Sequence, residues 1–191
     1  LTPVAVFDPI EILGSTVSRA SLSNPEEIKR LRLNIGDTIG VIKAREIIPK
    51  VVLNESGKDS NIEIPKSCPS CEKELAEDGP IIKCVNPYCR EKIVQKICFI
   101  AGKKVLDIPG LSEETARKIV NSLSDNTIGI FKERIIFVLT YDQILRLPGF
   151  AEKSARSLHS SIDNAKKNVT FSRFIKALCI DGIGEDVGKI L

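Results

Sequence analysis

The strongest indication of the fold comes from two cysteine pairs separated by twelve residues, Cys68-Pro-Ser-Cys71 and Cys84-Val-Asn-Pro-Tyr-Cys89. Each pair lies on a short, proline-containing turn, so four thiolates can meet at the corners of a tetrahedron, as Zn²⁺ requires in structural sites. Four protein ligands leave no position for water, and such a site stabilises the fold instead of catalysing a reaction. Two disulfides are the alternative, but nothing marks the chain as secreted. The sequence therefore predicts a zinc finger over residues 67–91.

Two further cysteines lie outside this spacing. Cys98 and Cys179 each stand in an apolar run. We expect them to be core thiols and not ligands.

Before the cysteines, residues 1–66 are rich in β-branched residues interrupted by Gly and Pro, which is typical of short strands. Strands are expected at residues 4–7, 39–42 and 47–53. One helix lies between them, with Asn24 as its cap, Pro25 in its first turn and Glu27 completing a capping box. The pattern favours a five-stranded barrel of the OB type, and an SH3-like barrel would look similar.

After the cysteines, residues 92–191 contain an internal repeat in three copies, which start at Leu106, Leu145 and Leu178. Each copy joins an apolar helix end to a second helix through a glycine-containing hairpin, the helix–hairpin–helix pattern. The third copy stops at Leu191, inside its second helix, so the chain is expected to be a fragment.

Glycine at the bend lets the backbone approach a phosphate, and the following helix offers free N–H groups and a positive dipole end. Such contacts read no base edges, so the predicted binding is independent of sequence and sensitive to salt. Lys153 and Arg156 follow the second hairpin and can reach flanking phosphates. A plain helical bundle with Pro-Gly turns is the alternative.

Charge and composition narrow the class of protein. Residues 1–91 carry 12 Lys/Arg and 14 Asp/Glu, whereas residues 92–191 carry 16 and 11. The basic second half favours a polyanionic partner. Phe7 is the only aromatic residue before Tyr88, which argues against base stacking on a single strand. No apolar run approaches the roughly 20 residues of a membrane span, and no signal peptide is evident. His159 has no partners for catalysis nearby in the sequence.

The order of barrel, four-cysteine finger and tandem hairpins resembles that of bacterial NAD-dependent DNA ligases. The segments that carry the resemblance are 1–10, 14–24, 35–38, 47–51, 84–89 and 171–185. The chain departs from the family pattern at Ser23, at Arg45-Glu46 and at Lys43, where the family has His, Gly-Asp and Arg. None of its lysines begins the Lys-x-Asp-Gly motif that accepts the nucleotide, so no catalytic residue is expected in this fragment.

The resemblance implies a multidomain α+β chain: an OB-fold β-barrel domain at 1–66, a small four-cysteine zinc finger at 67–91 and an all-α helix–hairpin–helix domain at 92–191. It implies structural Zn²⁺ here, and NAD and Mg²⁺ for the full-length enzyme only, which has an N-terminal adenylation domain missing from this chain. The implied metal ligands are Cys68, Cys71, Cys84 and Cys89. The implied DNA contacts are Arg19, Lys43, Ile47, Ile48, Gly110, Gly149, Lys153, Arg156, Gly182 and Gly184.

The function implied is nick sealing in replication and repair. The fragment is expected to be a cytoplasmic, nucleoid-associated monomer that binds nicked duplex DNA and does not ligate alone. Two alternatives stay open: a non-catalytic repair module that recognises damaged or branched DNA, and an RNA-binding OB–zinc protein, against which the scarcity of aromatics argues.

Overall fold

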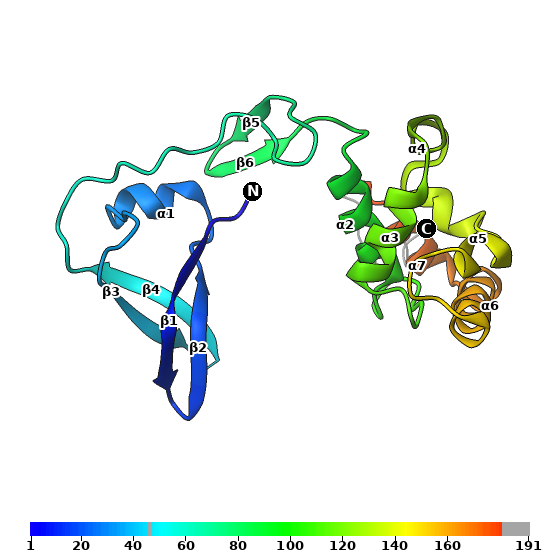
Figure 1. The fold of residues 1–191 in the computed structure, drawn as a ribbon, viewed down its shortest axis with the longest axis horizontal. Coiled ribbons are helices and arrows are strands. Elements are labelled where there is room, and N and C mark those ends of the chain that lie inside the picture. Colours follow the sequence, from blue (N-terminus) through cyan, green and yellow to red (C-terminus); the bar gives the residue numbers. More distant parts are fainter. Residues whose placement is uncertain (46, 181–191) are drawn as a thin grey trace. The chain divides into compact units, whose positions relative to one another are not determined.

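The chain divides between Asn86 and Pro87 into two units, each with its own hydrophobic core. The computed structural model describes residues 1–45 and 47–180. Figure 1 shows strands and one helix in the first unit and helices in the second. Among the helices of these described residues, none combines the length and the apolar character that crossing a membrane requires.

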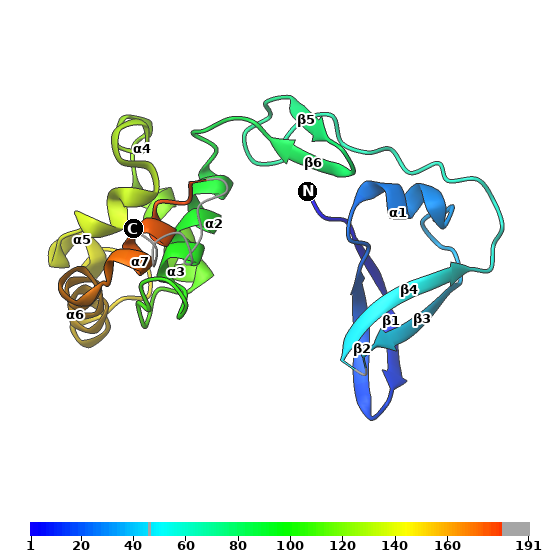
Figure 2. The same cartoon turned by 180° about the vertical axis from the view of Figure 1, so that it is seen from behind.

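Two antiparallel hairpins form most of the first unit (Figures 1 and 2). β1 (Val4–Ile12) pairs with β2 (Ser15–Ser21), and β3 (Ile39–Ala44) pairs with β4 (Ile48–Asn54). The β1–β2 register shifts between Val6 and Ile10, where a bulge takes in Asp8 and Pro9. β1 is longer than the four residues predicted from the sequence.

The helix α1 (Pro25–Arg30) starts as the sequence predicts. The side chain of Asn24 accepts hydrogen bonds from the N–H groups of Glu26 and Glu27, and Pro25 occupies the first turn. The predicted capping box also requires the Glu27 carboxylate to accept from the Asn24 N–H. Both of its oxygens accept from the Arg30 guanidinium instead, at 2.9 and 2.8 Å.

The hairpins and α1 enclose a small core, whose buried members are Ala20, Leu22, Ile28, Leu33 and Val51. The predicted closed five-stranded barrel does not appear in residues 1–66 as described, which contribute four strands in two separate sheets. The physical reason lies in residues 55–66, a polar and turn-rich stretch that forms no strand. Only Ile62 and Ile64 from this stretch pack against the core.

A third hairpin follows, made by β5 (Leu75–Asp78) and β6 (Ile81–Cys84). Its turn contains Gly79 at a φ of +58°, a conformation that glycine adopts without strain. The hairpin places Leu75 opposite Cys84.

The second unit consists of short helices around one aliphatic core. In order they are α2 (Arg90–Ala101), α3 (Glu113–Ser122), α4 (Asp125–Phe131), the 3₁₀ helix η1 (Lys132–Phe137), α5 (Tyr141–Leu145), α6 (Glu152–Asn168) and α7 (Phe171–Ala177). Its most deeply buried side chains include Ile97, Ala116, Ile119, Ile136, Ile144 and Leu158. Each buried aliphatic side chain of leucine or isoleucine size contributes about 1.5–3 kcal/mol relative to exposure.

Candidate functional site

Four cysteine sulfurs meet where the sequence predicts them to. The Sγ atoms of Cys68, Cys71, Cys84 and Cys89 all lie within 4.8 Å of one another. The Sγ atoms of Cys71 and Cys84 are 3.6 Å apart. Zinc–sulfur bonds of about 2.3 Å in a tetrahedron place sulfurs roughly 3.8 Å apart. A disulfide requires about 2.05 Å, and all four cysteines are free. The cluster therefore fits a tetrahedral metal ion and not two disulfides.

Local backbone structure delivers these sulfurs. In the first turn the N–H of Glu72 donates to the Cys68 carbonyl, and the N–H of Cys68 donates to the Lys73 carbonyl, both at 2.8 Å. The second pair starts at Cys84, the last residue of β6, and ends at Cys89, which precedes α2. The β5–β6 register fixes Cys84 beside the first turn, since the bridge from Ser67 to Glu74 continues that hairpin.

The cluster is also prepared electrostatically. A hydrogen bond from the side chain of Asn86 and one from the backbone of Lys73 lower the pKa of Cys71 to about 6, against the opposing effect of desolvation. Thiolates, and not thiols, bind metal ions. Cys68 and Cys89 are buried, whereas Cys71 and Cys84 are half-buried.

The remaining cysteines lie apart from the cluster. Cys98 and Cys179 are half-buried against the helical core, less deeply than expected for core thiols. Burial raises the pKa of both thiols. His159 lies on α6 with its Nδ1 3.5 Å from the Asp163 carboxylate, one helical turn along.

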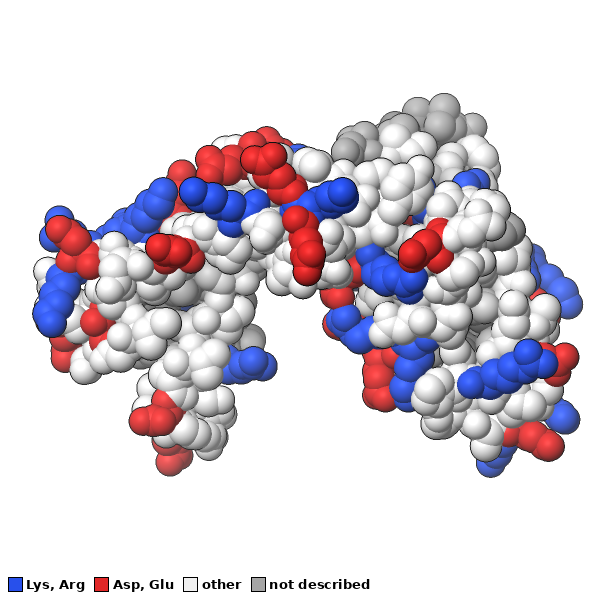
Figure 3. Space-filling model, turned by 45° about the horizontal axis from the view of Figure 1, so that its top comes forward, with Lys and Arg blue, Asp and Glu red and all other residues white. Residues whose placement is uncertain are grey.

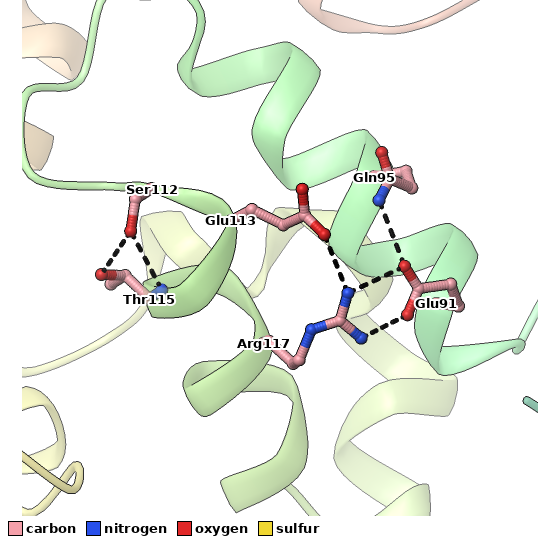
Figure 4. A network of polar contacts seen from close by, with 6 residues as sticks. All are labelled: Glu91, Gln95, Ser112, Glu113, Thr115 and Arg117. Carbon is pink, nitrogen blue, oxygen red and sulfur yellow. Dashed lines mark hydrogen bonds and ion pairs between the residues drawn. The ribbon is translucent and has the colours of Figure 1, made fainter. Parts of the chain in front are cut away.

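Directly after Cys89, a polar network joins α2 to α3 (Figure 4). The guanidinium of Arg117 donates to both carboxylate oxygens of Glu91 and, at 2.9 Å, to Glu113. Glu91 also accepts from Gln95 at 3.1 Å. This hydrogen bonding, chiefly from Arg117, lowers the pKa of Glu91.

Arg90 makes a second link, because its guanidinium donates to the carbonyls of Val120 and Leu123 at the end of α3. It also pairs with Asp125 at 2.7 Å, in the first turn of α4. Together the two links fix the start of α2 against its neighbours. Sequence reasoning missed them, since a charged residue on a helix does not reveal its tertiary partner.

The first helical hairpin comprises residues 108–112. Pro109 and Gly110 occupy the middle of a turn closed by a 3.3 Å hydrogen bond from the Leu111 N–H to the Ile108 carbonyl, and Gly110 has a φ of +85°. Ser112 then caps α3 by accepting from the Thr115 N–H at 3.3 Å (Figure 4). Leu111, between Gly110 and Ser112, is buried in the core.

The second helical hairpin comprises residues 147–151 and repeats this turn. The N–H of Phe150 donates to the Leu147 carbonyl at 3.1 Å, and Gly149 has a φ of +82°. Ala151 stands at the cap position of α6, where its methyl side chain accepts no hydrogen bond. Lys153 and Arg156 are exposed and line one hollow with Glu152, Ser157 and Ser160. The third copy continues past Ile180, so Gly182 and Gly184 lie outside the described residues.

The four residues of the first unit that the resemblance assigns to DNA do not all share one face. Ile47 and Ile48 are 78% and 59% exposed at the β3–β4 turn. Lys43 lies opposite Pro49 and Ile48 opposite Ala44, so Lys43 and Ile48 project from opposite faces of the hairpin. The Lys43 ammonium donates a hydrogen bond to the hydroxyl of Ser15. Arg19 is exposed on β2 opposite Val6.

Surface charge is mixed. Figure 3 shows Lys and Arg side chains interspersed with Asp and Glu, and not one continuous basic patch. Many of the cations of the second unit are paired, including Arg117 with Glu91 and Lys118 with Glu114. The face drawn in Figure 3 therefore carries local cations and not one broad basic surface.

Comparison with known proteins gives two findings. Residues 1–61 match the family model of the NAD-dependent DNA ligase OB-fold domain. The chain is 39% identical over an alignment of 195 residues to a DNA ligase of Campylobacter lari, 40% over 196 residues to one of Nitratiruptor sp. and 37% over 198 residues to one of Thermosipho africanus. Each alignment takes in the whole of this chain and 29% of the relative.

Proposed function

Because residues 1–61 belong to the NAD-dependent DNA ligase OB-fold family, and the whole chain is related to DNA ligases, we propose that this chain is the part of such an enzyme that holds duplex DNA. It would act on nicked DNA in replication and repair in the bacterial cytoplasm, as a monomer. The proposed division is an OB-fold domain at 1–66, a zinc finger at 67–91 and a helix–hairpin–helix domain at 92–191.

The two helical hairpins carry the proposal. Each presents a glycine at positive φ directly before a helix N-terminus, in a chain related throughout to DNA ligases. This geometry lets a phosphate approach backbone N–H groups and the positive end of the helix dipole. Such contacts act on any sequence, as sealing nicks at arbitrary positions requires. Gly110 and Gly149 would lie at the phosphates, with Lys153 and Arg156 beside the second hairpin. Gly182 and Gly184 would serve the third copy in the same way.

The first unit would contribute a second contact with DNA. Ile47 and Ile48 are apolar and exposed on a hairpin turn. Apolar side chains of this kind can insert along the minor groove, while cations such as Arg19 and Lys43 bind phosphates. Since Lys43 and Ile48 project from opposite faces, we expect Lys43 to contact the backbone beside the groove that receives the isoleucines.

Zinc would have a structural role. The four thiolates of Cys68, Cys71, Cys84 and Cys89 would hold the ion, which cross-links two turns that bury little apolar surface of their own. This chain's residues supply no open coordination position, so the site would organise the path from β6 into α2.

The complete reaction would need more than this chain. In the full-length enzyme NAD and Mg²⁺ would supply the adenylate and its charge neutralisation, and an adenylation domain with Lys-x-Asp-Gly would take up AMP. The sequence given contains no such motif. We therefore expect this chain to bind DNA without sealing it.

A binding titration tests the proposal. The zinc-loaded chain is titrated against matched nicked duplex, intact duplex and single strand across a salt series. We expect preference for duplex, with the nicked form bound at least as tightly, and a steep fall of affinity with salt. Preference for single strand, or no binding, would reject the proposal. Tight binding to flaps and junctions without any preference for nicks would favour the non-catalytic repair module instead.

A further inference from the structure

A lysine from another helix lies over the second hairpin. A Cβ atom built on Gly149 would stand 3.3 Å from Nζ of Lys118, which belongs to α3. The equivalent atom on Gly110 would meet only the methyl group Cδ1 of Leu158, at 3.9 Å. The second hairpin therefore has a cation at its glycine, whereas the first has an apolar neighbour.

The position of Lys118 is well defined. Its side chain is 30% exposed, so most of it is covered by the surrounding protein. The ammonium pairs with Glu114 at 2.8 Å, one turn back on α3, and Glu114 is 78% exposed. Exposed pairs of this spacing are weak. An ammonium has three donors, so it can bind a phosphate oxygen in addition to Glu114 or in exchange for it.

The charges at the second hairpin complete the arrangement. Lys153 and Arg156 approach along α6, and Glu152 is the acidic residue of the first turn. The first hairpin leads instead into Glu113 and Glu114. A phosphate at Gly149 would thus meet the Lys118 ammonium, and the helix that follows carries Glu152 in its first turn and then Lys153 and Arg156.

We propose that Lys118 binds the same phosphate as the second hairpin, and so makes this hairpin the stronger of the two backbone grips. The inference rests on the proposed function, because it needs duplex DNA at the hairpins. Lys118 lies on α3, the helix that follows the first hairpin, and would act at the second hairpin. The repeat pattern itself does not predict this contact. Glycine suits position 149 because of its φ of +82°, and a Cβ atom there would lie 3.3 Å from the ammonium at the end of the Lys118 side chain.

Salt-dependent binding of the zinc-loaded chain to nicked duplex tests the assignment. Lys118→Met keeps the stem and removes the charge. We expect it to weaken binding roughly tenfold, as loss of one charged hydrogen bond does. It should also lower the magnitude of the slope of log K against log salt by about 1, as loss of one phosphate contact requires. Lys118→Arg should restore both.

Lys166→Met is the matched control. Lys166 is also ion-paired, with Asp163 at 3.2 Å, and its side chain is 37% exposed, but it lies near the far end of α6. We expect it to keep the parent slope. A Lys118→Met slope equal to that of the parent, or an equal loss in Lys166→Met, would overturn the role of Lys118 and leave the proposed function standing. A parent chain that binds no duplex would overturn both. Circular dichroism melting of each variant verifies that the helices are intact.

Discussion

The two helical hairpins share a turn and differ in what surrounds it. Residues 108–112 and 147–151 both place Pro-Gly in the middle of a turn with glycine at a φ above +80°. At the first, Ser112 occupies one helix N–H and α3 is tied to α2 through Arg117. At the second, Ala151 leaves the helix end uncapped by its side chain, and Lys118 lies over the glycine. The repeated motif therefore shares one backbone shape, and we expect the residues around each copy to set the proposed affinity for phosphate.

The largest expected effect is that of removing a cysteine ligand, which should loosen the region that leads into the first hairpin and leave the second hairpin unchanged. Cys84→Ser should release zinc and cost several kcal/mol, because metal binding of roughly 10 kcal/mol orders this region. Hydrogen exchange should accelerate in β5, β6 and the first turn of α2, which leads to the first hairpin, and not in α6. Elemental analysis measures the zinc content, and mass spectrometry measures the rate of hydrogen exchange. Cys98→Ser is the control and should keep its zinc. Stoichiometric zinc and unchanged melting in Cys84→Ser would contradict the four-cysteine assignment.

The next prediction compares the glycines directly. Gly110→Val and Gly149→Val each place a β-branched residue at positive φ, which should cost about 1–2 kcal/mol of stability in both cases. Loss of DNA affinity should be unequal, roughly tenfold or more for Gly149→Val and smaller for Gly110→Val, because the cation lies at the second glycine. Denaturant unfolding and binding titrations on both variants give the two quantities. Equal losses of affinity would break the comparison.

Exchanging the caps should produce a smaller effect. Ser112→Ala removes the hydrogen bond to the Thr115 N–H and should destabilise the second unit by about 1 kcal/mol. The Ser154 hydroxyl already accepts from the Ala151 N–H at 3.0 Å, so Ala151→Ser would add only the missing acceptor at the cap position and should stabilise the unit by up to about 1 kcal/mol. Urea midpoints measure both changes. If Ala151→Ser were destabilising, the N–H groups at the start of α6 would already be satisfied.

The smallest effect is the pH dependence that comes from the Glu91–Arg117 pair, which joins α2 to α3. Arg117 lowers the pKa of Glu91, so the Glu91 carboxylate stabilises the fold at pH values above the ordinary glutamate pKa of about 4.3. This contribution is lost as the pH falls through the lower pKa of the folded state. Both side chains are more than a third exposed, which limits the contribution of Glu91 to roughly 0.5 kcal/mol. Unfolding measured from neutral to acid pH should show a flatter profile for Glu91→Gln and for Arg117→Met, and an unchanged profile in either would contradict it.

Local chemistry made several features predictable from the sequence. The spacing of the four cysteines indicated the cluster, Asn24 and Pro25 indicated the start of α1, and Gly110 and Gly149 indicated hairpin bends. Each of these depends on short local spacings, with the two cysteine pairs twelve residues apart as the longest of them. Local backbone preferences and short-range hydrogen bonds determine these features, and tertiary packing does not override them.

Features that depend on distant partners were not predictable. A closed barrel was expected because strand propensity does not reveal which strands meet, and residues 55–66 supply no strand to close it. The Glu27–Arg30 pair is a local exception, because Arg30 lies three residues along the same helix and competes with the capping box for the Glu27 carboxylate. The proximity of Lys118 to Gly149, and that of Arg90 to the end of α3, depend on how helices pack. No local pattern in the sequence encodes either.

The bulge in β1 bears on how the chain avoids self-association. Within the described part of the chain β1 has one partner strand, β2, so its other edge presents backbone groups to any extended peptide. Val4 and Val6 on this strand are exposed and would favour such pairing. Asp8 and Pro9 interrupt it: proline offers no N–H, a carboxylate is costly to bury between paired strands, and the bulge twists the edge out of register. We therefore expect Asp8 and Pro9 to disfavour pairing of this strand edge with a second chain.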